Sequence, residues 1–224
     1  MTTQALLEPA TIEITETKAT YEDYLALSHE GWLIEWVNEE VIYHMPPKPR
    51  HQILAGYLDR LLGNFIHFFN LGEVLPAPTE MKCFPRGNSR EPDILFLAKE
   101  NLARIGESRI EGPADLIIEI VSNDSVTRDF NEKFVEYQEC GVLEYWIIDP
   151  RPHRKRALFY QLGKNGRYES ILPKNGVYRS KIIPGFWLEV SWLWEMPDPL
   201  LTFAEIAGLP AEILAILKAK KSKN

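Results

Sequence analysis

The 224-residue chain has few cysteines, no long hydrophobic run and no excess of positive charge. Its two cysteines, Cys83 and Cys140, are too few for a disulfide framework or a four-thiolate zinc site. No stretch approaches the roughly 18 uncharged apolar residues of a membrane-spanning helix. The first residues, MTTQALLEPATIEITE, have neither the basic region nor the apolar core of a secretory signal. These absences predict a soluble protein in the reducing cytoplasm.

The balance of charge is acidic, with a formal net charge of −7. Because affinity for phosphate comes mainly from clustered Lys and Arg, this balance argues against a protein that coats nucleic acid nonspecifically. It leaves room for a nucleic-acid enzyme with acidic residues at a metal site and basic residues along a local track. Residues 151–156, RPHRKR, are expected to form a turn that is either solvated or in contact with a phosphate backbone. A second basic cluster, expected as a solvated helix end, comprises Lys218, Lys220, Lys221 and Lys223.

The apolar pattern predicts a mixed α/β sheet flanked by helices, in one domain. With 45% hydrophobic and 25% charged residues, the composition is typical of a globular protein. Helical spacing predicts a long helix from His51 to Phe69, and Thr20 with Asp23 forms a capping pattern for a short helix. Residues 32–43 predict a hairpin. Further strands are expected at 73–77, 80–84 and 93–97, with an antiparallel meander at 157–161, 167–172 and 177–183.

The centre of the sequence predicts two adjacent parallel strands joined by a helix. Residues 115–121, DLIIEIV, are mostly aliphatic, as in a strand covered on both faces. A helix is expected from Thr127 to Cys140, stopped by Gly141, with a second buried strand at 144–149. Around this unit we expect an N-terminal extension at 1–19, a main domain at 20–195 and a C-terminal helical tail at 196–224.

A charged residue, Glu119, interrupts the first of these central strands. An isolated ionised carboxylate in such a place is strongly unfavourable, so Glu119 must have a raised pKa, be paired or bind a cation. Asp93 follows Pro92 and opens another apolar strand. Carboxylates on neighbouring strands can converge on one divalent ion, which predicts an oxygen-ligand site suited to Mg²⁺.

The helix between the two central strands supplies a cation. Asp129, Lys133 and Tyr137 are spaced i, i+4 and i+8, so they form one polar stripe. If this stripe faces the preceding strand, Lys133 approaches Glu119. The apolar packing positions of the same helix are expected to be Phe130, Phe134 and Val135.

Two more polar residues stand at notable positions, and each has a structural as well as a functional interpretation. Glu35 breaks the apolar alternation of its strand, and His51 opens the long helix after a proline-rich turn. His51 fits a capping or half-buried histidine as well as a ligand, and Tyr137 fits packing with an anchored hydroxyl. Spacing alone leaves open whether Glu119 and Lys133 form a structural ion pair or part of a catalytic metal site.

The order of several motifs resembles a known family. The chain contains, in sequence, WLIEWVNEEVI with Glu35, then His51, EPDILFL, DLIIEIVSNDS and RDFNEKFVEYQECGVLEYWIIDP. In this order it resembles the putative restriction endonuclease-like family of the PD-(D/E)XK nuclease superfamily, over about residues 20–175. The resemblance implies a restriction endonuclease-like core.

The same resemblance implies the members of the site. Asp93, Glu119 and the backbone carbonyl of Ile120 correspond to metal ligands, for Mg²⁺ or for Mn²⁺ as a substitute. Two residues after Glu119 the simplest superfamily pattern has Lys, whereas this chain has Val121, so Lys133 would supply the lysine. The implied catalytic set is Glu35, Asp93, Glu119 and Lys133, supported by His51, Asp129 and Tyr137.

Two functions follow as hypotheses. The first is a metal-dependent endonuclease that hydrolyses DNA, in which the metal ion lowers the pKa of a bound water and Lys133 orients that water or stabilises developing charge. Glu35 would complete a second metal position or hold Lys133. Such nucleases usually work as dimers, so a homodimer is expected. The second is a catalytically inactive protein of the same fold that serves as an interaction or nucleic-acid-binding module, with Glu119 and Lys133 as a structural pair.

Overall fold

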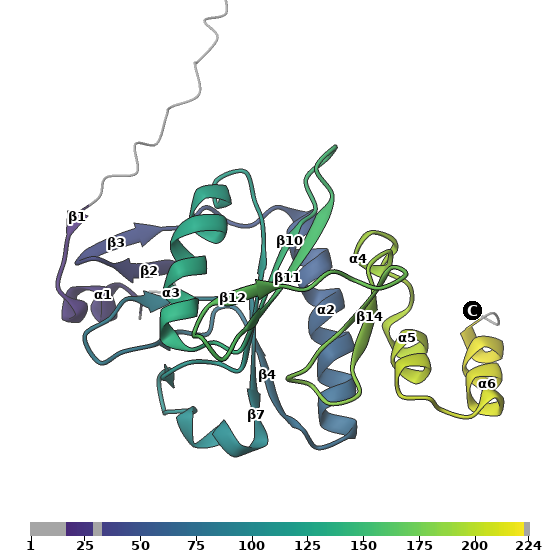
Figure 1. Cartoon of the computed structure of the whole chain (residues 1–224). Helices are drawn as coiled ribbons and strands as arrows, with labels where there is room; N and C mark the ends of the chain where they lie inside the picture. The colour runs from purple at the N-terminus through teal and green to yellow at the C-terminus, as the bar shows by residue number, and fades with distance from the viewer. Residues whose placement is uncertain (1–16, 29–32, 222–224) are drawn as a thin grey trace, which may run out of the picture.

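The computed structural model of the chain describes residues 17–28 and 33–221. The expectations for the N-terminal segment up to residue 16, for Trp32 and for Lys223 lie outside the described residues. Two six-stranded sheets and one two-stranded sheet form the body, with helices against them (Figure 1). The mixed α/β class is confirmed, but the strands do not form the single sheet that was expected. In the described segments, no helix is both long enough and apolar enough to cross a membrane.

The larger expected strands form the central sheet, which contains both parallel and antiparallel pairs. β9 and β10 are parallel, with Ile118 opposite Trp146, whereas β7 runs antiparallel to β9. The expected strand–helix–strand unit is therefore confirmed. The strand order is β12 (Tyr168–Ser170), β11 (Arg156–Leu162), β10 (Glu144–Asp149), β9 (Leu116–Ile120), β7 (Ile94–Ala98) and β4 (Gly72–Pro76).

The two faces of the central sheet are covered by different helices (Figure 1). Ile118 and Ile120 of β9 belong to the same apolar core as the long helix α2 (Pro49–Phe68). Ile117 belongs to a second core together with Tyr137 of α3 (Lys133–Cys140). Because successive side chains of a strand point to opposite faces, Glu119 points toward α3.

A second sheet, the N-terminal sheet, carries Glu35 on β2 and Arg90 on β6. The expected hairpin is confirmed over its described part, with Asn38 and Glu39 at φ of 52° and 64°, as a tight two-residue turn requires. Strand β6 was not expected from the sequence. The order is β1 (Thr17–Lys18), β3 (Glu40–Tyr43), β2 (Ile34–Val37), β6 (Ser89–Arg90), β5 (Met81–Lys82) and β8 (Ile110–Glu111).

The first short helix begins at the capping residues that the sequence predicts. Asp23 Oδ2 accepts from the Thr20 amide at 2.9 Å and Thr20 Oγ1 accepts from the Asp23 amide at 3.2 Å, which confirms the capping pattern of α1 (Tyr21–Ser28). α3 is preceded by one wide helical turn, η2 (Arg128–Glu132), and ends at Gly141, whose φ is 89°. A short 3₁₀ helix, η1 (Lys99–Arg104), follows β7.

The packing role expected for Val135 is wrong. Its side chain is 49% exposed, because it is two residues away from both Lys133 and Tyr137 and therefore lies on the opposite face of the helix. Phe134 does pack, against the rings of Tyr145, Tyr160 and Tyr168.

The expected three-strand meander is confirmed only in part. β11 and β12 extend the central sheet, but β13 (Val177–Arg179) pairs instead with β14 (Trp187–Glu189). Pro173 has no amide hydrogen for a ladder, and the turn at Asn175 and Gly176, both with positive φ, redirects the chain. The C-terminal helices are α4 (Trp192–Glu195), α5 (Pro199–Ile206), which was not expected, and α6 (Ala211–Lys221), which was.

The two cysteines are joined, contrary to the expectation of free thiols in a reducing setting. A disulfide connects Cys83, which follows β5, to Cys140 at the end of α3. Stable disulfides are characteristic of oxidising environments. The pair ties the N-terminal sheet to the helix that faces Glu119.

Candidate active site

Glu119 is buried at the centre of a polar cluster between the central sheet and α3. Its Oε1 accepts hydrogen bonds from Lys133 Nζ at 2.9 Å and from Tyr137 Oη at 2.8 Å. Burial, together with the negative charges of Asp129, Asp93 and Glu35, outweighs Lys133 and raises the pKa of Glu119 to about 8. The stripe at i, i+4 and i+8 thus faces the preceding strand as expected.

Glu35 reaches the same lysine from the other sheet. Its Oε1 lies 3.2 Å from Lys133 Nζ and accepts the Glu91 amide at 3.1 Å, while its Oε2 accepts from Arg90 Nη1 at 3.0 Å. Nε2 of His44 lies 3.3 Å from the same Oε2. Burial opposes ionisation, but Lys133 and Arg90 hold the pKa of Glu35 well below its usual range. Glu35 is therefore a fixed anion that positions Lys133.

Arg90 is a fully buried member of the cluster that the sequence reading missed. It is 1% exposed and donates to Glu136 Oε2 from Nε at 2.9 Å and from Nη2 at 2.7 Å, as well as to Glu35. Two features of the sequence could have suggested this pair. Arg90 lies two residues before Pro92, and Glu136 lies one helical turn after Lys133.

Asp93 lies beside Glu119 on the neighbouring strand. Because Ile94 is opposite Ile118 in an antiparallel pair, Asp93 falls opposite Glu119 in the same register. Asp93 Oδ2 accepts from the Ile120 amide at 2.7 Å and lies 3.1 Å from His51 Nε2. Burial of the imidazole is outweighed by Asp93, which raises the pKa of His51. The other nitrogen of His51, Nδ1, is buried and has no hydrogen-bond partner in the described chain.

Asp129 supplies another buried carboxylate. One oxygen, Oδ2, accepts a hydrogen bond from Ser125 Oγ. The other, Oδ1, has no hydrogen-bond partner among the residues described and lies 3.9 Å from Lys133 Nζ. Burial is the largest cause that raises the pKa of Asp129 to about 6.

The cluster carries more negative than positive charge, which fits an oxygen-ligand cation site. The carboxylates are Glu35, Asp93, Glu119, Asp129 and Glu136, against the cations Lys133 and Arg90. Hydrogen bonds within the described chain occupy only one oxygen each of Asp93 and Glu119. Hard oxygen donors of this kind suit Mg²⁺. No three His, Cys, Asp or Glu side chains within residues 17–28 and 33–221 already stand in a metal-binding arrangement, so binding would require the carboxylates to adjust.

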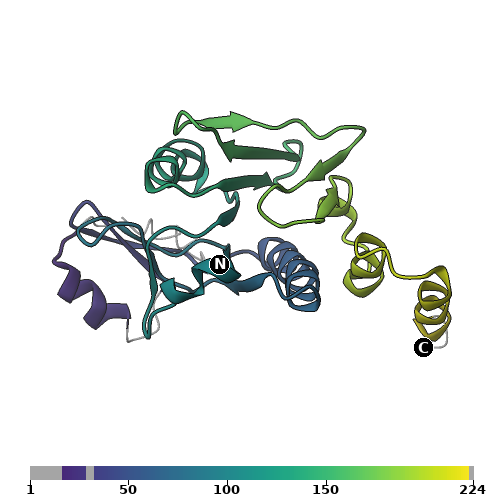
Figure 2. The same cartoon turned by 60° about the horizontal axis from the view of Figure 1, so that its bottom comes forward.

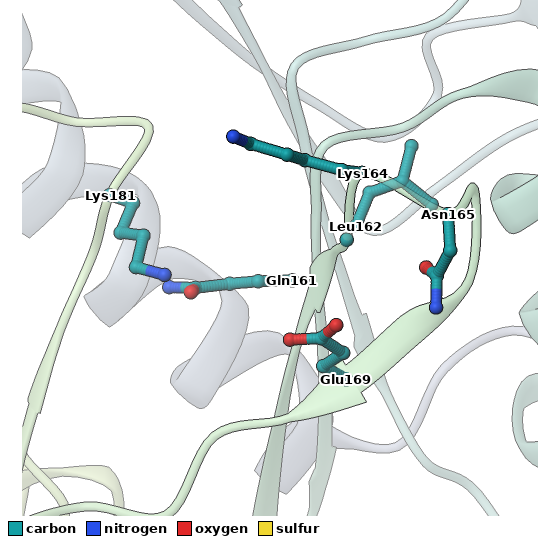
Figure 3. A pocket seen from close by; sticks show the side chains of 7 residues that line it. Gln161, Leu162, Lys164, Asn165, Glu169 and Lys181 are labelled. Atoms are coloured by element: carbon teal, nitrogen blue, oxygen red, sulfur yellow. The ribbon is translucent and has the colours of Figure 1, made fainter.

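A separate hollow lies at the other end of β10 (Figure 3). Gln161 lines it and stands opposite Glu144, the first residue of β10, whereas Glu119 stands opposite Ile147 near the last. Its other labelled residues are Leu162, Lys164, Asn165, Glu169 and Lys181. None of them contacts the carboxylate cluster, so this hollow is not part of the candidate active site.

A protein-family model matches the sequence, and a solved structure has a similar fold. A solved structure from Anabaena variabilis, described as a putative nuclease belonging to DUF820, superposes with a TM-score of 0.62 at 17% sequence identity, covering 78% of this chain and 96% of that one. This likeness shows a nuclease-type fold. No curated protein matches the sequence. Residues 21–191 match the Uma2 family, described as putative restriction endonuclease. The match spans most of the 224 residues, so the chain belongs to the Uma2 family, which supports a nuclease function in general.

Proposed function

We propose that the chain is a Mg²⁺-dependent endonuclease that hydrolyses phosphodiester bonds in DNA. The observation that carries this proposal is the contact of Lys133 Nζ with Glu119, 2.9 Å away, directly beside Asp93 on the next strand. Nucleases of the superfamily that the sequence resembles use two carboxylates and a lysine in such a cluster. Family membership supports the nuclease class but not the metal, the substrate or the individual residues.

Asp93 and Glu119, with the carbonyl of Ile120, would hold the metal ion, which when bound lowers the pKa of a coordinated water and polarises a phosphate oxygen. Lys133 is buried among Glu119, Glu35 and Asp129, which outweigh its desolvation and raise its pKa. It therefore stays protonated and acts as a fixed positive charge next to the scissile phosphate rather than as a base. Glu35 and Tyr137 position this charge.

The alternative is an inactive nuclease fold used as a binding module. It is favoured by one observation: Lys133 forms ion pairs with both Glu35 and Glu119, as a structural pair would. Under this alternative, Glu119→Gln breaks a structural ion pair and destabilises the fold. A metal site predicts little loss or even a gain in stability in the absence of metal, because the neutral glutamine adds no negative charge to the other carboxylates.

The direct test is nicking of supercoiled plasmid with Mg²⁺ or Mn²⁺, and with EDTA as the blank. We expect nicking with either metal and none with EDTA. Glu119→Ala is the control for contaminating nuclease, since activity that survives this substitution does not come from this site. Parallel digestion of a labelled DNA duplex and of a labelled RNA with the same sequence shows whether the protein prefers DNA or RNA. Wild-type protein that binds but never nicks would support the inactive module.

Cleavage of both strands of a duplex requires two sites, so we also propose that two copies of the chain act together. Sedimentation velocity, with and without a DNA duplex, tests this directly. A single species of monomer mass in both samples would contradict it.

A further inference from the structure

The turn between β10 and β11 carries cations that the proposed reaction does not use. At its base, the buried carboxylate of Asp149 accepts from Arg151 Nε and Nη2, each at 2.8 Å, and lies 3.6 Å from Arg156 Nε. Beyond the base, Arg154 and Lys155, which we call the tip, are exposed and pair with no acidic side chain in the described chain. The base of the turn therefore holds one carboxylate against two guanidinium groups, whereas the tip presents two further positive charges without an ionic partner in the described chain.

This turn leaves the central sheet at the same end of the strands as the carboxylates. Ile120 stands opposite Ile148 in the parallel pair, and the next residue of β10, Asp149, stands opposite Arg156 of β11. Only β10 separates β9 from β11, which places the base of the turn roughly 10 Å from the strand of Glu119. Figure 1 shows the loop between β10 and β11 projecting beyond this end of the sheet.

The turn is anchored to the helical segment that lines the carboxylate cluster. The Arg156 guanidinium lies 4.4 Å from the centre of the Phe130 ring, within the range of a cation–π contact. Phe130 follows Asp129 in η2. The base of the turn is thus in contact with the segment that lines the candidate active site.

Two more cations without an ion pair lie at the start of α2. Lys48 and Arg50 immediately precede His51, whose imidazole contacts Asp93. Both side chains are exposed and make no ion pair within the described residues. In a protein with a formal net charge of −7, exposed cations beside His51 and in the β10–β11 turn form a local track suited to a polyanion.

We propose that Arg154 and Lys155 bind the phosphate backbone of a DNA duplex beside the scissile position, with Lys48 and Arg50 contacting the backbone next to His51. This inference rests on the proposed function, because it assumes that the substrate is a phosphodiester chain. Such contacts position a duplex without reading its sequence. They also offset the repulsion between the substrate and the acidic remainder of the protein.

The test compares two double variants that remove the same charge. Arg154→Ala with Lys155→Ala removes the tip, and Lys218→Ala with Lys220→Ala removes two exposed lysines of α6, which lies far from α3 in both views (Figures 1 and 2). Binding of a short fluorescent DNA duplex is measured by anisotropy in EDTA, so that no cleavage occurs. We expect the tip variant to bind about 10-fold more weakly and its salt slope to fall by about 2, one for each lost phosphate contact. The α6 variant should bind within about twofold of wild type.

Plasmid nicking by the same proteins separates this inference from the proposed function. If wild type nicks but the tip variant binds and nicks equally well, or if the α6 variant loses as much affinity, the role of the turn is refuted and the nuclease proposal stands. Absence of duplex binding by wild type also refutes it. If binding depends on the tip while wild type never nicks, the nuclease proposal fails and the turn remains a DNA-binding surface.

Discussion

Within the cluster, equally buried carboxylates differ in pKa because they contact different numbers of cations. Glu35 contacts both Lys133 and Arg90 and keeps a low pKa. Glu119 contacts only Lys133 and lies near other carboxylates, so its pKa rises. Under the proposed function the two residues would play different parts: Glu35 would hold Lys133, whereas a bound cation would favour the charged form of Glu119.

This difference predicts how stability depends on pH without metal. The unfolded chain releases the Glu119 proton near pH 4.5, whereas the folded protein keeps it up to about pH 8. A raised pKa in the folded state stabilises at low pH, and this contribution is lost as pH rises through that window. Asp129, raised from 3.8 to about 6, acts in the same direction. We expect the melting temperature in EDTA to fall between about pH 5 and pH 8, and Mg²⁺ to raise it more at the upper end.

Differential scanning fluorimetry across this range provides the measurement. The melting temperature of Glu119→Gln should fall less over this pH range than that of the wild type, because the substituted side chain has no proton to lose. A wild-type melting temperature that is constant with pH, or that rises, would contradict the assigned direction.

Lys133 is expected to support stability and, under the proposed function, activity. Lys133→Met removes the cation shared by Glu35, Glu119 and Asp129, and we expect it to cost about 3–5 kcal/mol in the free energy of unfolding and to abolish plasmid nicking. Tyr137→Phe removes only the 2.8 Å hydrogen bond to Glu119. It should cost about 1–2 kcal/mol and leave measurable nicking. Urea denaturation gives the free energies, and equal loss of activity in both variants would argue against a distinct role for Lys133.

At the scale of secondary-structure elements, α3 is held at both ends. Its first turn carries Lys133 against β9, and its last residue, Cys140, is bonded to Cys83 beside β5. The helix therefore connects the two large sheets.

Loss of this disulfide is expected to loosen that connection. The bond closes a loop across a sequence separation of 57 residues, for which chain entropy gives a stabilisation of about 4 kcal/mol. We expect dithiothreitol, or Cys83→Ser with Cys140→Ser, to lower the melting temperature. Reductant should have no further effect on the double variant. Wild-type protein with two titratable thiols after purification under air would contradict the pairing.

At the scale of the whole molecule, the C-terminal helices contribute unequally. Phe203 of α5 is 7% exposed, and its ring lies 5.3 Å from that of Phe68 in α2, whereas α6 has no buried residue. In Figures 1 and 2, α6 lies beyond α5, at the end of the molecule opposite α1.

Truncation after Leu209 is therefore expected to change the melting temperature by about 2 °C or less and to leave nicking unaltered. The surface pair that it removes, Lys221 with Asp198, contributes little. As a contrast, Phe203→Ala should cost about 3 kcal/mol. Circular dichroism melts of the two proteins give the comparison, and a large loss on truncation would show that α6 belongs to the core.

Local sequence patterns predicted most elements of the central sheet and its helices. The i, i+4, i+8 stripe and the charged Glu119 in an aliphatic strand predicted the contact with Lys133, since helix and strand periodicity fix which side chains share a face. Arg90 and β6 were missed, because a two-residue strand has no detectable period. The departure of β13 from the central sheet was missed because strand partners are chosen by tertiary packing.

The sequence by itself determined the class of fold, the central strand–helix–strand unit and the presence of a buried acidic residue with a lysine one helix away, because these depend on periodicity over neighbouring residues. The motif order had already placed Glu35 with them. Only the tertiary structure decided that Arg90 from a second sheet joins them, that Cys83 meets Cys140, and that the basic turn leaves the sheet beside the carboxylates. Each of these depends on contacts between distant segments. Such contacts form when apolar faces are buried together, and this leaves no trace in local spacing.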